Sequence, residues 1–286
     1  MTKGTPYIFN HTQEKQELER LQLIERFHDP KTRLRFLATG IKPGWDCLEI
    51  GPGAGSIMRW LAKAVGTSGN VVGLDINPRF VNRTRCHNIK VMHGDIATTS
   101  FPGDNFHLVH ARFVLIHTPA YRKALANIVR ALRPGGWLVL EEPDFSTARV
   151  VAGPKQIRRS VERVNQAIIK MFENAGLNPA FGLEFPQLLQ QFGMSQLKVE
   201  NEVPLTQGGS PLARIMKLSA RQLGNAYLAT GLATKTDINR YCRFADDSKS
   251  WAIYHGTVVV CSEKRSSPNE QVHRKRTYQD NRRVTK

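Results

Sequence analysis

The hydrophobic pattern of the first forty residues predicts helices. Between residues 12 and 39, apolar side chains recur every three residues along one face. These positions are Leu18, Leu21, Ile24 and Phe27. Asp29-Pro30 interrupts the run, and a second apolar run follows through Leu34 and Leu37. We therefore expect residues 1–40 to form a lid of two helices that packs against the domain or closes over it.

From Trp45 onward, short apolar runs alternate with amphipathic ones. The runs WDCLEI, NVVGLDI, IKVMHGD, FHLVHARF and GGWLVLEE predict strands. Between them, SIMRWLAKAV, NPRFVNRTRC and PAYRKALANIVRAL predict helices, the second with Asn77 as N-cap and Pro78 at its first position. Strands that alternate with helices predict a parallel sheet with helices on both faces. Ligands of such sheets bind at the carboxyl ends of the strands.

The alternation lapses after Pro143. Residues 155–175, 186–192 and 211–246 have helical patterns, whereas SQLKVENEV and AIYHGTVVVC are strand candidates. The return to strands predicts one sheet within a domain of residues 41–262, with helical cap insertions near residues 150–192 and 211–246. Residues 263–286 contain no apolar run, and we expect a basic, disordered tail there.

Composition and charge allow a packed core and leave the partner open. The chain has 286 residues, of which 41% are hydrophobic, and a formal net charge of +17. Residues 263–286 hold eight Lys or Arg and three Asp or Glu, so they supply +5, and the remaining +12 forms no continuous stripe. A nucleic-acid partner is thus compatible with the charge but not favoured by it.

The cysteines and the chain start indicate a cytoplasmic protein. Four cysteines are scattered without a C-x-x-C pair, which suits a reducing compartment. The first residues hold no apolar segment of a secretory signal, and no apolar run approaches the roughly 20 residues that cross a bilayer. We expect no membrane association, and the sequence predicts no oligomeric state.

The stretch LEIGPGAGS is a glycine-rich loop behind a strand. No lysine follows it, which excludes a nucleotide triphosphate loop of the G-x-x-x-x-G-K type. A dinucleotide fingerprint would need a third glycine where Ser56 stands. Glu49 precedes the loop, and its carboxylate would oppose a pyrophosphate but suit an ammonium group. The loop therefore favours a partly cationic ligand without phosphate.

Two further carboxylates follow the next two strands. Asp75 ends the second strand, where an acidic side chain can accept hydrogen bonds from ribose hydroxyls. Asp95 ends the third strand in HGDI, where it could accept from an adenine amino group. Carboxylates at three successive strand ends describe a ligand with an amino-acid end, a ribose and an adenine, which is S-adenosylmethionine.

These motifs resemble those of class I S-adenosylmethionine-dependent methyltransferases. LEIGPGAGS is similar to their first motif, VVGLDI to the second, HGDI to the third, FHLVHARFVLIH to the fourth and ALRPGGWLVLEE to the strand-five motif. The resemblance covers residues 40–145 closely and points to the ubiquinone-biosynthesis-like small-molecule branch. It implies a Rossmann-like seven-stranded α/β sheet with the last strand antiparallel, and methyl transfer to an O, N or C nucleophile of a small molecule.

The resemblance also implies a set of donor-binding residues. The glycines would line the methionine portion near Glu49, Asp75 would hold the ribose, Asp95 and Ile96 would bind the adenine, and residues 111–113 would flank the sulfonium. The full set is Glu49, Gly51, Gly53, Gly55, Asp75, Ile76, Asp95, Ile96, Ala111, Arg112 and Phe113.

Methyl transfer requires alignment of donor and acceptor, and a base only where the nucleophile must lose a proton. His117 follows strand four and is the candidate base, although it would equally serve as a cap of the next helix. His110 lies within the strand and is expected to be buried. It points away from His107, so we expect no metal. The acidic residues of LEEPDF either orient a substrate group or are solvated; they are Glu141, Glu142 and Asp144.

Three functions stay compatible with the sequence. The favoured one is a small-molecule methyltransferase. An RNA or protein methyltransferase would suit the charge, but the chain lacks an N/D-P-P-Y/F run, a Pro-Cys pair and an appended RNA-binding module. A cofactor-binding homologue that no longer methylates is the third.

Overall fold

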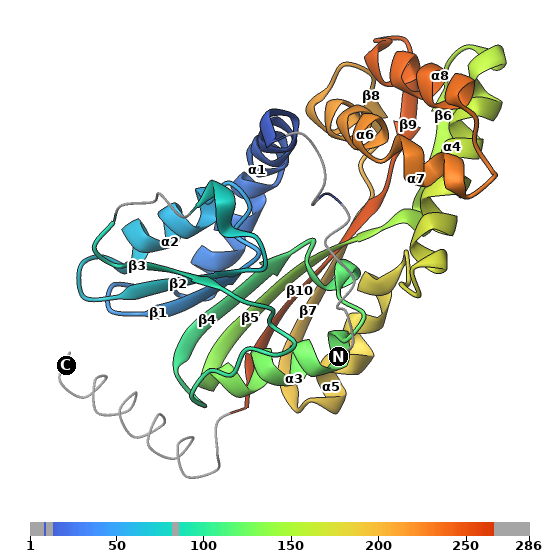
Figure 1. Cartoon of the computed structure of the whole chain (residues 1–286). Coiled ribbons are helices and arrows are strands. Elements are labelled where there is room, and N and C mark those ends of the chain that lie inside the picture. Colours follow the sequence, from blue (N-terminus) through green and yellow to red (C-terminus); the bar gives the residue numbers. More distant parts are fainter. Residues whose placement is uncertain (1–8, 10–13, 82–85, 266–286) are drawn as a thin grey trace, which may run out of the picture.

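The computed structural model of the chain describes residues 9, 14–81 and 86–265. Within them, the centre is a seven-stranded sheet of order β3-β2-β1-β4-β5-β10-β7 (Figure 1). β10 runs antiparallel to both β5 and β7, whereas the other neighbouring strands pair in parallel, which confirms the predicted Rossmann-like class with its last strand antiparallel. The strands are β1 (Asp46–Ile50), β2 (Asn70–Asp75), β3 (Ile89–His93), β4 (Phe106–Arg112), β5 (Leu132–Asp144), β7 (Met194–Glu202) and β10 (Gly256–Lys264).

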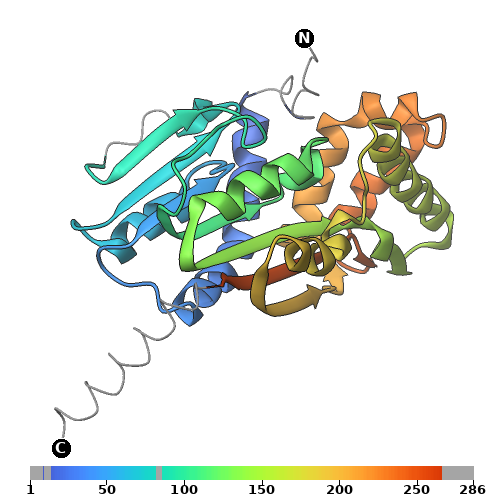
Figure 2. The same cartoon turned by 90° about the horizontal axis from the view of Figure 1, so that it is seen from below.

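Helices cover both faces of this sheet (Figures 1 and 2). On one face lie α1 (Glu14–Ala38) and α2 (Ser56–Val65), and on the other α3 (Tyr121–Ala131) and α5 (Phe185–Gln191). Successive strand residues point to opposite faces. Leu108 therefore joins the core under α1 and α2, whereas its neighbour Val109 joins the core under α3 and α5.

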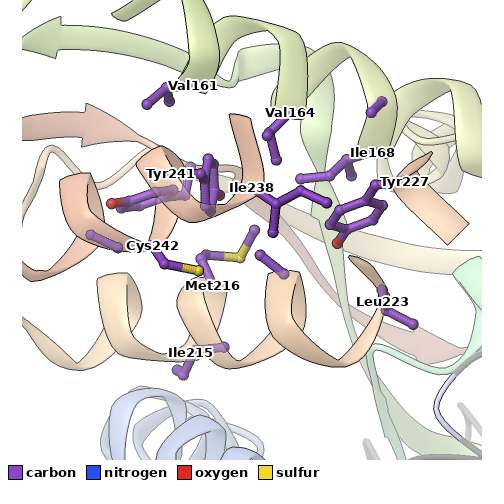
Figure 3. Close-up of a cluster of buried hydrophobic side chains, with 14 of the residues drawn as sticks. Val161, Val164, Ile168, Ile215, Met216, Leu223, Tyr227, Ile238, Tyr241 and Cys242 are labelled. Carbon is purple, nitrogen blue, oxygen red and sulfur yellow. The ribbon is translucent and has the colours of Figure 1, made fainter. Parts of the chain in front are cut away.

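A cap stands beyond the ends of β5 and β10 (Figure 1). It consists of α4 (Lys155–Asn174), α6 (Pro211–Gln222), α7 (Gly224–Ala229) and α8 (Lys235–Asp246). A small sheet of order β6-β9-β8 joins them, made of β6 (Arg149–Ala152), β9 (Trp251–Ile253) and β8 (Thr206–Gln207). Figure 3 shows the shared core of the cap, in which Val164 of α4, Met216 of α6 and Ile238 of α8 converge.

The prediction of one sheet and one final strand was wrong. The run AIYHGTVVVC is divided into β9, which pairs with β6 and β8, and β10, which pairs with β5 and β7. Tyr254 and His255 connect the two strands. Both strands are buried, so the apolar run continues across the junction and gives no sign that the chain leaves one sheet for another.

The expected break at Asp29-Pro30 is also absent from the described helix. α1 is continuous and contains Pro30. Its buried face is largely polar, whereas Leu34 and Leu37 are 65% and 58% exposed. Asp29 beside the proline is buried and accepts a hydrogen bond from Arg112 (2.9 Å), so contacts with the sheet outweigh the lost backbone hydrogen bond.

Two other predicted segments lie partly outside the described residues. In NPRFVNRTRC, a short 3₁₀ helix η1 (Pro78–Phe80) follows Asn77 as N-cap, and residues 82–85 are outside. Of the predicted tail, residues 266–286 are outside. β10 continues to Lys264, whose Nζ donates to Asp104 (2.8 Å) and to the carbonyl of Leu132 (2.5 Å). The last strand therefore extends into the segment 263–286 that was predicted to be a tail. In the described part, no helix is long and apolar enough to span a membrane.

Candidate active site

A cavity lies at the carboxyl ends of β1, β2 and β4, bordered by α1 and the cap. It brings together most residues that the sequence analysis singled out. These are Glu49, Gly51, Gly53, Asp75, Ile76, Asp95, Ile96, Arg112, Phe113 and His117. Among the described residues predicted for the site, Gly55 and Ala111 do not line it. Ala111 is fully buried in the sheet beside Ile50 and Leu140, and Gly55 precedes α2.

The glycine loop brings the backbone close to the cavity. Gly51 has φ +64°, and a Cβ there would lie 2.5 Å from Cγ2 of Val114. At the start of α2, the backbone N–H of Ser56 donates to Glu25 Oε1 (3.0 Å). Helix N-termini attract anions, and here a carboxylate from α1 already occupies that position. This arrangement leaves no ready place for a phosphate.

The two predicted acids beyond β1 occupy fixed turns at the cavity wall. Asp75 Oδ1 accepts from the backbone N–H of Asn77 (2.7 Å), and Asp95 Oδ1 accepts from that of Ala97 (2.8 Å). Burial raises the pKa of Asp75, and the Asn77 N–H opposes this. The side chain that follows Asp75, Ile76, is 47% exposed at the rim.

Glu49 belongs to a buried charge network. Its Oε2 accepts from His110 Nδ1 (2.8 Å), and His110 Nε2 lies 3.9 Å from Glu141 Oε1. Burial alone would lower the pKa of His110, but the two glutamates outweigh it and raise the pKa to about 9. His110 is thus a buried imidazolium between two carboxylates, and it balances part of the charge of Glu49. Its burial confirms the expectation for a histidine within the strand.

The polar face of α1 completes this network. Thr32 Oγ1 donates to Glu141 Oε1 (2.7 Å) and accepts from Arg112 Nη1 (3.1 Å). Arg112 Nη2 donates in turn to Asp29. These contacts fix α1 to the ends of β4 and β5, which explains why a helix with exposed leucines buries its polar side.

The acids of LEEPDF are not solvated, so that interpretation was wrong. Glu141, Glu142 and Asp144 are each at most 1% exposed. Glu142 accepts from the backbone N–H groups of residues 114–116, at the start of the 3₁₀ helix η2 (Leu115–His117), and Asp144 accepts from that of Ser146 (2.9 Å). None of these three carboxylates belongs to the described lining of the cavity. Their hydrogen-bond partners are groups of the protein itself.

Four rings form an aromatic row along the cavity: His255, Phe145, Phe172 and His117. Phe145, in the 3₁₀ helix η3 (Phe145–Thr147), lies 5.5 Å from His255 and 5.4 Å from Phe172 between ring centroids. Phe172 of α4 stacks on His117 at 5.9 Å. Phe113, whose φ is +57°, lies 5.9 Å from His255. Such backbone strain in a residue with a side chain is typical of functional sites.

His117, the predicted base, lies at the far end of this row. Burial, with a smaller contribution from the charge of Arg20, lowers its pKa to about 3. It is therefore neutral at physiological pH. Both its role as a base and its role as a cap stay predictions.

Several lining residues escaped the sequence analysis. His255 lies inside a run that was interpreted as one strand, and a lone histidine in that apolar run was the available signal. Glu25 and Arg20 come from α1, where only the apolar positions had been considered. Arg20 is held by Glu17 through two hydrogen bonds of 2.7 and 2.8 Å.

The cap side of the cavity is mostly apolar. Figure 3 shows Ile168 of α4 near Tyr227 of α7, and Met216 on the side of α6 that faces α4. The lining residues of the cap are Ile168, Met171, Phe172, Ile215, Met216, Ser219, Leu223 and Tyr227. The cavity thus joins an acidic, glycine-lined half to an apolar half.

Comparison with known proteins places this geometry in a family. Residues 48–140 match the family described as "Methyltransferase domain". Over this segment the chain is similar to methyltransferase domains. The match covers the segment in which the five motifs occur in order, and it confirms the resemblance that they carry.

Two curated relatives extend the likeness. The first is described as an uncharacterized 37.1 kDa protein in transposon TN4556 of Streptomyces fradiae, 31% identical over 59% of this chain and 48% of its own length. The second is a demethylmenaquinone methyltransferase of Staphylococcus aureus, 32% identical over 39% of this chain and 48% of its own length. This chain thus spans about half the length of each of these two relatives.

A solved structure supports the fold. The YcgJ protein of Bacillus subtilis aligns with a TM-score of 0.54, covering 84% of this chain and all of that protein. The identity is 16%, so the likeness concerns the fold alone.

Proposed function

We propose that the chain is an S-adenosylmethionine-dependent methyltransferase that transfers a methyl group to an O, N or C nucleophile of a small-molecule acceptor. The observation that carries this proposal is one continuous cavity, in which a half suited to the donor opens into an apolar half under the cap. The methyltransferase domain and the similarity to demethylmenaquinone methyltransferases support it.

The residues of the glycine-lined half fit S-adenosylmethionine. Asp75 would accept from the ribose hydroxyls, and Asp95 with the backbone of Ile96 would bind the adenine. The backbone of Gly51 and Gly53 would lie along the methionine portion, with Glu49 toward its ammonium group. The Glu25 carboxylate at the start of α2 favours a ligand without phosphate. When bound, the donor supplies an electrophilic methyl group on a sulfonium.

The chain's own task is then to align the acceptor and to exclude water. In this proposal, α1 is part of a lid of residues 1–40, and the helices near residues 150–192 and 211–246 form a cap that selects the acceptor of the 41–262 domain. α1 packs against α2 on one side and α6 on the other, so it bridges the two halves (Figure 1).

The cap also bears on the alternatives. An apolar compartment between α4, α6 and α7 suits a small apolar molecule better than RNA or a protein segment. All four cysteines lie among the described residues and are free thiols, which supports the proposed cytoplasmic location.

Binding of S-adenosylmethionine, measured by isothermal titration calorimetry, tests the donor site. Asp75→Ala should weaken binding about 10- to 100-fold, since a hydrogen bond to a charged group contributes roughly 1.5–3 kcal/mol. Asp104→Asn is the matched control, because Asp104 is exposed, and asparagine tolerates its φ of +60°. Unchanged affinity in Asp75→Ala would refute the donor-site assignment.

Incubation with methyl-labelled S-adenosylmethionine and an extract of the source cells tests the acceptor class. Label in the small-molecule fraction, absent with Asp75→Ala, is the expected result. Label in RNA or protein would contradict the small-molecule proposal, and no label together with intact donor binding would favour a homologue that does not methylate.

A further inference from the structure

His255 occupies the junction at which the chain passes from the cap sheet to the main sheet. It is 4% exposed, and its ring lies between those of Phe113 and Phe145 in the wall of the cavity. This position is next to β4 and β5, where the two halves of the cavity meet. A histidine in this place can contact the acceptor.

One hydrogen bond fixes the proton of this ring. His255 Nδ1 lies 2.8 Å from the carbonyl oxygen of Gly256. A carbonyl can only accept, so Nδ1 carries the proton, and in the neutral ring the lone pair is on Nε2. Among the described residues, no hydrogen bond engages Nε2. The neutral ring therefore presents a proton acceptor at the wall of the cavity.

We propose that His255 is the general base of the reaction, and that it deprotonates a hydroxyl of phenol or enol type on an apolar acceptor. The inference rests on the proposed function. The hydroxyl oxygen forms a bond to the methyl carbon, the carbon–sulfur bond breaks with its electron pair going to sulfur, and the hydroxyl proton passes to Nε2. The imidazolium then releases this proton to water.

The charges around the two cavity histidines favour His255 over His117. The Asp144 carboxylate, in register with Gly256 across β5 and β10, stabilises a protonated His255. Burial outweighs this and lowers the pKa of His255, and the ring of His28 lies nearby. His117 has Arg20 as its charged neighbour, which opposes proton uptake. An anion is thus positioned to support the proton at His255.

The lining of the apolar half selects a neutral hydroxyl rather than an amine. Within the described residues, the cap contributes no acidic side chain to the cavity. The nearby Glu17 already holds Arg20. An ammonium group would be buried there without a counter-charge, which is strongly unfavourable. A phenol is neutral until it gives up its proton, and its ring can pack against the aromatic row.

The test uses 4-nitrophenol, whose anion is yellow, with the full chain loaded with S-adenosylhomocysteine. At pH 7 the wild type should bind the probe with a larger anion fraction than free solution shows, because His255 accepts the proton. His255→Gln should bind it mainly as the neutral phenol. His87→Gln is the control, since His87 is exposed at the opposite end of the sheet and should match the wild type.

Methyl transfer to the same probe gives the second readout. kcat of His255→Gln should fall at least 100-fold, within the roughly 10²- to 10⁴-fold contribution of general acid–base catalysis. Its affinity for S-adenosylmethionine should stay within twofold of the wild type, which also shows that the variant is folded. In the wild type, kcat/KM should rise with pH through the pKa of His255 and then level off, and this step should be missing in the variant.

The outcomes separate the two proposals. A wild type that does not bind S-adenosylmethionine refutes the proposed function. A wild type that binds it but neither binds nor methylates the phenol overturns the acceptor class. Equal rates in the wild type and His255→Gln, or a comparable loss only in His117→Gln, overturn the assignment of the base.

Discussion

Gly51→Ala should destabilise the fold by about 2–4 kcal/mol, and a neighbouring substitution should restore part of it. Gly51 has φ +64°, a conformation that costs a residue with a Cβ roughly 1–2 kcal/mol. The new Cβ would also lie 2.5 Å from Val114 Cγ2. Overpacking of this kind costs about 1–3 kcal/mol, and the smaller entropy of the unfolded alanine chain offsets about 0.4–1 kcal/mol.

Two further variants separate the backbone cost from the clash. Gly176→Ala carries nearly the same conformation, φ +70°, but no described atom lies within 4 Å of its Cβ position. It should therefore show the backbone cost alone. Val114→Ala removes the clashing methyl group, so the pair Gly51→Ala and Val114→Ala should show a favourable coupling of about 1–3 kcal/mol in a double-mutant cycle.

Urea denaturation of the four variants and the wild type measures these free energies. A difference of 1 kcal/mol should also change Tm by about 2–4 °C for a domain of this size. If Gly51→Ala were no more destabilising than Gly176→Ala, or if Val114→Ala gave no coupling, the close approach of this loop to Val114 would be refuted.

Three other substitutions test the polar face of α1 and the buried network. Thr32→Val should lower the free energy of unfolding, measured in urea, by about 1–3 kcal/mol, because Glu141 and Arg112 each lose a buried hydrogen-bond partner. An unchanged urea midpoint would argue against these hydrogen bonds between α1 and the sheet. Pro30→Ala should stabilise the fold by roughly 1–2 kcal/mol, since proline in a helix interior costs about 3 kcal/mol and restricts the unfolded chain; a loss of stability would contradict a continuous α1. In the folded protein the pKa of His110 is about 9, above its usual value of 6.5. The ion pairs of His110 therefore stabilise the fold fully below pH 6.5, and this stabilisation is lost as the pH rises through 9. The unfolding free energy should thus fall more steeply between pH 6.5 and 9 in the wild type than in His110→Asn, and equal slopes would refute the pair.

Much of the main sheet could be predicted because its signals are local. The helix SIMRWLAKAV is found as α2 with the predicted bounds, and the apolar runs before and after it correspond to β1 and β2. Glycines and carboxylates directly after buried strands must lie at one edge of a parallel sheet. The positions of Glu49, Asp75 and Asp95 along the cavity follow from that spacing.

The N-terminal helix shows where such signals fail. Counting apolar positions predicted a break at Pro30 and an inward face with leucines. In the structure the helix continues past Pro30. Its polar side chains Asp29 and Thr32 point inward because they form hydrogen bonds with Arg112 and Glu141 of the sheet. A helix whose buried partners are polar has no apolar stripe to reveal its orientation.

The sequence by itself determined the class of the fold, the order of the motifs and the donor-like chemistry of the strand ends, because each depends on residues only a few positions apart. The tertiary structure alone decided which polar groups meet. Thr32 and Glu141 are 109 positions apart, and His255 reaches Phe113 only because the chain changes sheets at Tyr254. Such pairs form when separate elements pack together and bury their polar groups, which then need partners that no local pattern of the chain specifies.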